Sequence, residues 1–268
     1  MSQLPLQQLL EFAVDAAWQA DRITLGYYQT AMPVELKADH SPVTVADRQA
    51  EALLRELIGH YWPDHGIVGE ELGRRPGASG ATWILDPIDG TRSFVHGVPL
   101  YATLVALTVD GEPVLGVAHF PALHETVYAG PGLGCYWDGR RAHTSAVADL
   151  GEAVLSISDI VSCEKYGKGA SWQRLLAACG TRRTWGDAYG YALVATGRAE
   201  VMVDPIMELW DAGPLQVILE EAGGTFTDWQ GNPTIYAHEG VATNGALFEP
   251  VMKLIEPGWT RPAARSAR

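Results

Sequence analysis

The chain contains Trp83-Ile84-Leu85-Asp86-Pro87-Ile88-Asp89-Gly90-Thr91, in which a short apolar run leads into two carboxylates and a Pro/Gly turn. The apolar residues predict a buried strand, and Gly90-Thr91 predicts the start of a helix. Carboxylates at such a junction can hold hard cations such as Mg²⁺, and helix N–H groups can receive a phosphate. Asp-Pro and Asp-Gly are also ordinary turn dipeptides, so the stretch alone fits a plain turn as well.

Two further acidic segments accompany this turn, Gly69-Glu70-Glu71 before it and Trp210-Asp211-Ala212-Gly213 after it. Carboxylates that share a small cleft raise one another's pKa strongly unless cations neutralise them. The sequence therefore predicts a site for two Mg²⁺ ions about 4 Å apart, the usual arrangement in phosphoryl transfer. The predicted ligands are Glu70, Asp86, Asp89 and Asp211, with Asp86 bridging both ions and the Ile88 backbone carbonyl in the same turn.

The predicted helix start supplies groups for the phosphate and for the attacking water. The N–H groups of Gly90 and Thr91 would point at an anion, with no side chain obstructing at the glycine. In the predicted reaction the ion pair polarises the ester and holds a water that attacks in line, while the Thr91 hydroxyl positions this water and Asp47 accepts its proton. Glu70 is the third candidate for a catalytic role. Thr91 as an N-cap and Asp47 as a capping-box acid are alternative interpretations that can coexist with these roles.

Composition narrows the class of protein. The 268 residues fit one large domain or two closely packed halves, and a net charge of −13 disfavours a nucleic-acid partner. The three cysteines show neither disulfide-framework nor zinc-site spacing, which favours a reducing compartment. We see no signal peptide before Leu4 and no apolar run of membrane-spanning length. We expect a cytoplasmic protein with no membrane or nucleic-acid partner.

Hydrophobic periodicity divides the chain near residue 143. Residues 1–143 are predicted to form an α+β half that carries most metal ligands, with helices over 4–28 and 45–61 and an antiparallel hairpin over 104–120. Residues 144–268 are predicted to form an α/β half that carries Asp211 and the specificity residues. This half is predicted to hold strands at 154–158, 201–203 and 225–229 and helices at 171–178, 189–196 and 212–222.

The motifs resemble those of the inositol monophosphatase family of Mg²⁺-dependent, lithium-sensitive phosphatases. The matching residues are Gly69-Glu70-Glu71, Asp86-Pro87-Ile88-Asp89-Gly90-Thr91 and Trp210-Asp211, and the resemblance extends from Ser41 to Gly224. It implies a five-layered αβαβα sandwich and a homodimer. It also implies one Mg²⁺ held by Glu70, Asp86 and the Ile88 carbonyl, a second held by Asp86, Asp89 and Asp211, and a third, weaker ion near Glu70.

The family acts on several phosphate esters, so the metal motif does not name the substrate. Arg92-Ser93-Phe94 has a basic residue that resembles the histidinol-phosphate branch, whereas inositol phosphatases typically carry an Asn before this Phe. Arg183-Thr184-Trp185-Gly186-Asp187 resembles the R-x-aromatic-G-D segment of the same branch. Asp204 lies seven residues before Asp211, where inositol enzymes also keep an acid. The predicted substrate-binding residues are Gly90, Thr91, Arg183, Asp187, Asp204 and Asp211.

Asp187 and Asp204 are carboxylates beyond the predicted metal ligands, and they favour a cationic substrate. Histidinol phosphate offers an ammonium and an imidazole, and a hydrogen bond to a charged group contributes roughly 1.5–3 kcal/mol. Asp187 as a helix cap and Arg92 and Arg183 as surface charges are the structural alternatives. We therefore predict a Mg²⁺-dependent histidinol-phosphatase of histidine biosynthesis. An inositol-1-monophosphatase or broad sugar-phosphate phosphatase is the alternative enzyme, and a non-catalytic scaffold is the alternative outside catalysis.

Overall fold

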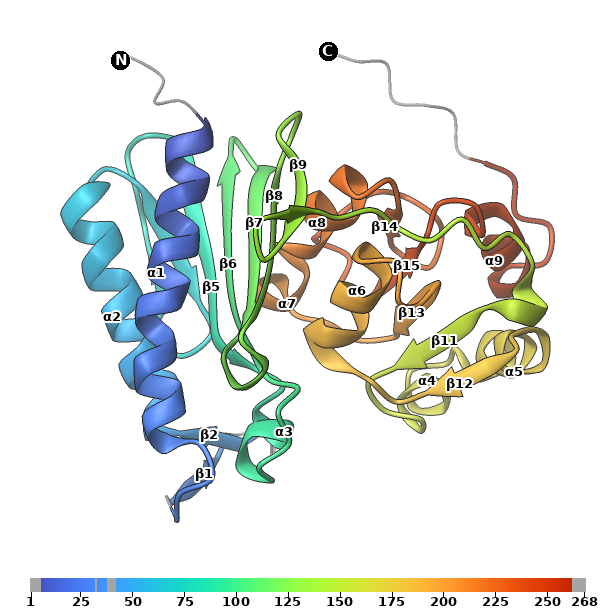
Figure 1. The fold of residues 1–268 in the computed structure, drawn as a ribbon, viewed down its shortest axis with the longest axis horizontal. Helices are drawn as coiled ribbons and strands as arrows, with labels where there is room; N and C mark the ends of the chain where they lie inside the picture. Colours follow the sequence, from blue (N-terminus) through green and yellow to red (C-terminus); the bar gives the residue numbers. More distant parts are fainter. Residues whose placement is uncertain (1–5, 32, 38–41, 262–268) are drawn as a thin grey trace.

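The computed structural model describes residues 6–31, 33–37 and 42–261. Figure 1 shows helices and sheets alternating across the molecule in five layers, as the αβαβα prediction requires. Helices α1 (Leu6–Tyr27) and α2 (Val45–Tyr61) cover the outer face of the first sheet. Small side chains of α1, among them Ala13, Ala16 and Ala20, are fully buried, so this helix packs closely against its neighbours.

The first sheet has eight strands in the order β10-β9-β8-β7-β6-β5-β3-β4. All neighbouring strands pair antiparallel except β3 and β5, which are parallel. The predicted hairpin is confirmed as β6 and β7, joined at Asp110-Gly111. The strands are β3 (Gly66–Gly69), β4 (Gly73–Arg75), β5 (Ala81–Asp89), β6 (Ala102–Val109), β7 (Glu112–Phe120), β8 (Glu125–Gly130), β9 (Gly134–Trp137) and β10 (Arg140–Arg141).

The second sheet has five strands in the order β12-β11-β13-β15-β14. Its first three strands are parallel and its last two pairings are antiparallel. The strands are β11 (Val154–Ile157), β12 (Thr181–Arg183), β13 (Val201–Asp204), β14 (Thr225–Thr227) and β15 (Gly240–Thr243), and the outer helices are α4 (Ser162–Lys165), α5 (Gly169–Ala178) and α9 (Phe248–Ile255). A separate two-stranded arm is formed by β1 (Val34–Leu36) and β2 (Pro42–Thr44).

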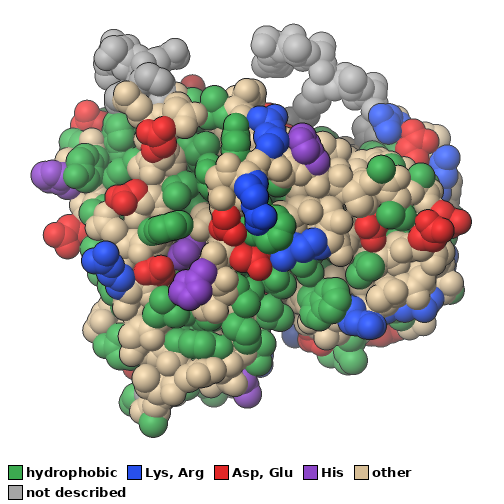
Figure 2. All heavy atoms as spheres, in the orientation of Figure 1, with side chains coloured by type: hydrophobic (Ala, Val, Ile, Leu, Met, Phe, Trp, Pro, Cys, Tyr) green, Lys and Arg blue, Asp and Glu red, His purple; other side chains and the backbone are tan. Residues whose placement is uncertain are grey.

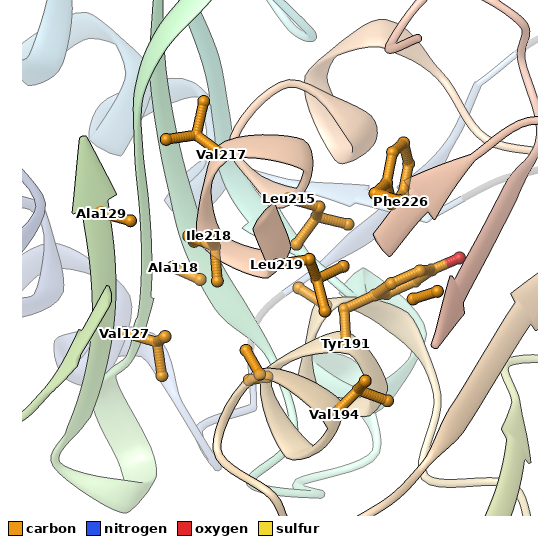
Figure 3. Packing of buried hydrophobic residues seen from close by; sticks show 14 of the residues in the cluster. Ala118, Val127, Ala129, Tyr191, Val194, Leu215, Val217, Ile218, Leu219 and Phe226 are labelled. Carbon is orange, nitrogen blue, oxygen red and sulfur yellow. The ribbon is translucent and has the colours of Figure 1, made fainter. Parts of the chain in front are cut away.

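The central layer joins the two sheets and consists of α6 (Asp187–Ala195), α7 (Leu209–Ala212) and α8 (Leu215–Glu221). Figure 3 shows Val217 and Ile218 of α8 facing the first sheet, while Leu215 and Leu219 lie beside Tyr191 and Phe226. Burial of each such aliphatic side chain contributes roughly 1.5–3 kcal/mol. The two halves of the chain therefore share one layer of buried side chains.

Four predicted helices have different bounds in the structure, and two of them, α5 and α6, differ by only one or two residues at an end. Residues 4 and 5 of the predicted first helix lie outside the described residues, and the helix runs from Leu6 to Tyr27. The helix predicted over 212–222 begins later than expected, because α7 ends at Ala212 and α8 spans Leu215–Glu221. Pro214 lacks an N–H group and cannot continue the hydrogen-bond ladder of α7. As a result, Asp211 lies inside a separate short helix.

One face of the molecule carries both acidic and basic side chains. Figure 2 shows acidic and basic side chains interspersed over the face that is drawn. Among the helices that the structure describes, none combines the length and the apolar character needed to cross a membrane.

Candidate functional site

The end of β5 delivers two carboxylates to one place. Residues three apart on a regular strand point to opposite faces of the sheet. Between Asp86 and Asp89 the pairing with β6 slips, since Asp86 lies opposite Leu104 and Asp89 lies opposite Ala102. This bulge turns both side chains toward α7. Carboxylate oxygens of Asp86, Asp89 and Asp211 all lie within 4.8 Å of one another.

Hydrogen bonds fix each carboxylate of this cluster. Asp86 accepts from the Ile88 N–H at 3.0 Å, and Asp89 accepts from the Ala188 N–H at 2.8 Å. Asp211 accepts from the Glu208 N–H at 2.8 Å, in the capping box of α7. Ile88 belongs to the first half of the chain, and Ala188 and Glu208 belong to the second. Backbone groups of both halves therefore hold the three carboxylates in position.

The electrostatics of the cluster suit a cation. Burial raises the pKa of Asp86 and of Asp89 well above the ordinary value, and neighbouring carboxylates raise both further. Burial likewise raises the pKa of Asp211 to about 7. Oxygen donors gathered this closely match the ligand preference of Mg²⁺. The donor set therefore fits a hard divalent cation.

Glu70 reaches the same site from the turn that follows β3. Its N–H donates to the Leu85 carbonyl at 3.2 Å, which ties this turn to β5. Lys37, at the end of β1, donates from Nζ to Glu70 Oε1 at 2.6 Å and to Glu71 Oε1 at 2.5 Å. Burial lowers the pKa of Lys37, but hydrogen bonds to the two carboxylates outweigh it and raise that pKa. Lys37 is a charged partner of Glu70 that the sequence did not reveal.

Asp47 and Thr91 each form hydrogen bonds with residues close to them in the sequence. Asp47 Oδ2 accepts from the Thr44 N–H at 2.8 Å and from the Thr44 hydroxyl at 2.6 Å, so the capping-box interpretation is confirmed. Asp47 Oδ1 is buried and has no hydrogen-bond partner within the described part of the chain. The Thr91 hydroxyl donates to the Ile88 carbonyl at 3.0 Å. The proton relay between Thr91 and Asp47 stays a prediction.

Gly90 is in contact with a residue of the second half. It adopts φ 74°, and a Cβ at this position would lie 2.9 Å from Asp187 Oδ2. A side chain would therefore strain the backbone and crowd this carboxylate. Asp187 opens α6 with φ 53°, its N–H donates to the Ser158 hydroxyl at 2.8 Å, and burial raises its pKa. The structure thus brings Asp187 against the predicted phosphate-binding turn.

A cavity of about 210 Å³ extends from the cluster toward α6 and β13. Asp187 and Asp204 both line it, together with Asp89 and Asp211. It shares these last two acids and Asp187 with an adjoining groove of about 880 Å³. The groove is lined by the turn after β5 and by Glu70. A ligand could therefore contact the cluster and the additional carboxylates at once.

Asp204 is held at the base of this cavity. It accepts from the Ser158 N–H at 3.1 Å, from the Ser158 hydroxyl at 2.9 Å and from the Tyr191 hydroxyl at 3.0 Å. Burial raises the pKa of Asp204 to about 8. A cation bound nearby would favour its charged form.

The two arginines considered for substrate binding differ in position. Arg92 lines the groove and lowers the pKa of Asp187 by its charge, although burial outweighs it. Arg183 lies exposed on β12, where Nη1 donates to the Arg182 carbonyl at 2.7 Å and the guanidinium lies 5.7 Å from the Trp185 ring. Among the described residues that line the cavity and the groove, Arg183 is absent. The structure does not bring Arg183 to the cavity or the groove, in agreement with the surface-charge alternative.

The raised pKa values give a pH-dependent stability. The ordinary value for aspartate is about 3.9, so the folded protein binds more protons than the unfolded chain between about pH 4 and pH 8. The resulting stabilisation is fully present below this window and is lost as pH rises through the folded-state values of about 7 for Asp211 and about 8 for Asp204. We expect the Tm of the metal-free protein to fall between pH 5 and pH 8, and the fall to shrink in excess Mg²⁺. Calorimetry at the two pH values tests this, and a constant Tm would contradict it.

Comparison with known proteins agrees with this geometry. Residues 5–258 match the family model of the inositol monophosphatase family. The chain is 42% identical to a histidinol-phosphatase of Chlorobaculum parvum, over 93% of this chain and 97% of the relative. It is 31% identical to a fructose-1,6-bisphosphatase/inositol-1-monophosphatase of Thermotoga maritima, over 92% and 95%.

A solved structure of similar sequence has the same fold as this chain. The extragenic suppressor protein suhB of Bartonella henselae superposes with a TM-score of 0.88 at 28% identity, covering 94% of this chain and 99% of that protein. The family match spans nearly the whole chain, both sheets included. The chain therefore belongs to the inositol monophosphatase family and is a phosphoric monoester hydrolase.

Proposed function

We propose that the chain is a Mg²⁺-dependent histidinol-phosphatase that hydrolyses L-histidinol phosphate to L-histidinol and phosphate in histidine biosynthesis. The observation that carries this proposal is the cavity in which Asp187 and Asp204 lie beside the carboxylate cluster. A phosphate at the cluster would leave the remainder of the substrate facing these two acids. Their charge suits the ammonium and imidazole of histidinol phosphate.

In this proposal Glu70, Asp86, Asp89, Asp211 and the Ile88 carbonyl hold two Mg²⁺ ions, with a third, weaker one near Glu70. When bound, Mg²⁺ would neutralise the carboxylates and polarise the phosphate ester. The buried, repelling carboxylates of the cluster support a cation here. We also propose that the enzyme works in the cytoplasm as a homodimer, as the family resemblance implies.

The residues of the chain bind and orient the other reactants. The N–H groups of Gly90 and Thr91 hold a phosphate oxygen at the start of α3 (Thr91–Val95). The Thr91 hydroxyl orients the attacking water, and Asp47 accepts the proton. For this the hydroxyl must turn from the Ile88 carbonyl, its partner in the structure. Asp187 and Asp204 then fix the end of the substrate remote from the phosphate.

The relatives support two related substrates. A histidinol-phosphatase is 42% identical over nearly the full length, which supports the proposed ester. The relative named fructose-1,6-bisphosphatase/inositol-1-monophosphatase, at 31% identity, supports the alternative of an inositol-1-monophosphatase or broad sugar-phosphate phosphatase. The Asp at position 187 favours the former, because neutral sugar hydroxyls need no second buried carboxylate.

Metal removal tests the chemical part of the proposal. Protein treated with a chelator and then dialysed is expected to release almost no phosphate from histidinol phosphate, because without the ions nothing polarises the phosphate ester. Addition of Mg²⁺ is expected to restore turnover. Addition of Na⁺ at equal ionic strength is the control and is expected not to restore it. Full activity in the presence of excess chelator would overturn the metal-dependent mechanism.

A further inference from the structure

Glu51 is a buried acid that none of the steps above uses. It lies on α2, four residues after Asp47, and its side chain is 0% exposed. A buried carboxylate is costly unless it is paired and hydrogen-bonded. In this protein its partners lie in the turn that carries Glu70.

Both oxygens of Glu51 accept hydrogen bonds from that turn. Oε2 accepts from the Glu71 N–H at 2.7 Å, and Oε1 accepts from the Leu72 N–H at 3.1 Å. The Glu70 N–H is already bound to the Leu85 carbonyl. Three successive amides are therefore fixed, the first by strand β5 and the next two by one side chain of α2.

Arg55 completes the connection from the same helix. Its Nε donates to Glu51 Oε1 at 2.7 Å, and its Nη2 donates to the Gly73 carbonyl at the far side of the turn. The pair thus holds the turn at its N–H groups and at a carbonyl. The Glu51 carboxylate also packs against Gly69, where any Cβ would overlap it. The Glu51 carboxylate therefore contacts the turn through hydrogen bonds and through close packing at Gly69.

We infer that Glu51 is a positioning residue, which fixes the backbone of residues 70–72 so that the Glu70 carboxylate faces the proposed metal site. This inference rests on the proposed function, because it gives Glu70 the role of a metal ligand. Glu51 does not touch the cluster itself and acts only through the turn. Mutation of a hydrogen-bonded partner that orients a metal ligand typically lowers metal affinity or activity by 10- to 100-fold.

The test is Glu51→Gln in the full chain, with Glu56→Gln as the matched control on an exposed position of α2. Glutamine keeps the shape but places an NH₂ group opposite a backbone N–H, so one of the two amides loses its acceptor. Binding of Mn²⁺ alone to metal-free protein is measured by electron paramagnetic resonance. The Mg²⁺ concentration that gives half-maximal phosphatase activity is measured alongside.

We expect Glu51→Gln to weaken Mn²⁺ binding about 10- to 100-fold and to raise the half-maximal Mg²⁺ concentration by a similar factor. At saturating Mg²⁺ its kcat should stay within about threefold of the parent, because the ligands themselves remain. A purely structural role would lower the fraction of folded protein, and with it kcat, at an unchanged half-maximal Mg²⁺ concentration. That result, or unchanged Mn²⁺ binding, would overturn the inference.

If Glu51→Gln does not fold, Arg55→Gln provides the second test, because it removes the Nε donor and the link to Gly73 while leaving Glu51 in place. It should shift metal binding in the same direction, and unchanged binding would overturn the inference. Mn²⁺ binding by the parent protein distinguishes failure of the proposed metal site from failure of the role given to Glu51. A parent that binds no Mn²⁺ overturns the proposed metal site itself, whereas binding by parent and variants alike overturns only the role of Glu51.

Discussion

Asp89→Asn is expected to lower kcat/KM for histidinol phosphate by at least about 100-fold, more than the loss of an outer partner of a metal ligand typically causes. Asp89 lies within 4.8 Å of Asp86 and Asp211, and a neutral amide is a poor ligand for a hard divalent cation. The amide would also lose part of its interaction with the Ala188 N–H, which links the cluster to α6. Steady-state phosphate release at several Mg²⁺ concentrations measures the effect.

The control for this variant is Asp64→Asn, the same chemical change at an exposed turn before β3. It should leave kcat/KM within about twofold of the parent, as surface substitutions generally do. Circular dichroism and the Tm of Asp89→Asn are measured to check that its fold is intact. Parent-like activity of Asp89→Asn at modest Mg²⁺ would contradict the assignment of the carboxylate cluster to metal binding.

Asp187→Asn is expected to impair one substrate selectively. Removing the charge that faces an ammonium should cost about 1.5–3 kcal/mol, or roughly ten- to a hundredfold in kcat/KM for histidinol phosphate. The backbone should be unchanged, because asparagine tolerates the left-handed φ of 53° found at this position. The Ser158 hydroxyl bonds to the backbone N–H, which the substitution keeps.

The matched measurement uses glycerol phosphate, an ester with no cationic group. Asp187→Asn should hydrolyse it about as well as the parent, because the cluster and the Gly90 turn remain. Damage to the metal site would instead slow both substrates together. Parallel loss on both esters, or no change on either, would remove Asp187 from the specificity residues.

The main elements of the site could be predicted because they lie where apolar runs stop. The run before Asp86 predicted a buried strand, and β5 spans Ala81–Asp89 with nearly every side chain buried. The helix predicted over 45–61, with Asp47 as its capping-box acid, is confirmed as α2 (Val45–Tyr61). Residue type and position along the chain were sufficient for these features, since burial and capping act locally.

Features that depend on distant contacts could not be predicted in the same way. The bulge between Asp86 and Asp89 depends on pairing with β6, and Lys37 reaches Glu70 from the β1–β2 arm. Arg183 matched a sequence segment, yet an edge strand carries it to the surface. Glu51 did leave a signal, namely an acid inside the buried stripe of α2 beside Ala50 and Leu54. An acid in such a stripe needs buried partners, and these are the amides of the turn.

The substrate is the central claim, and one measurement tests it most directly. The parent enzyme is given histidinol phosphate, myo-inositol 1-phosphate and fructose 1,6-bisphosphate in parallel at saturating Mg²⁺, and kcat/KM is determined for each. We expect histidinol phosphate to exceed both others by at least about tenfold, since one buried charge-assisted contact is worth that much. Equal or higher kcat/KM for the inositol or fructose ester would contradict the account and would favour the broad sugar-phosphate phosphatase.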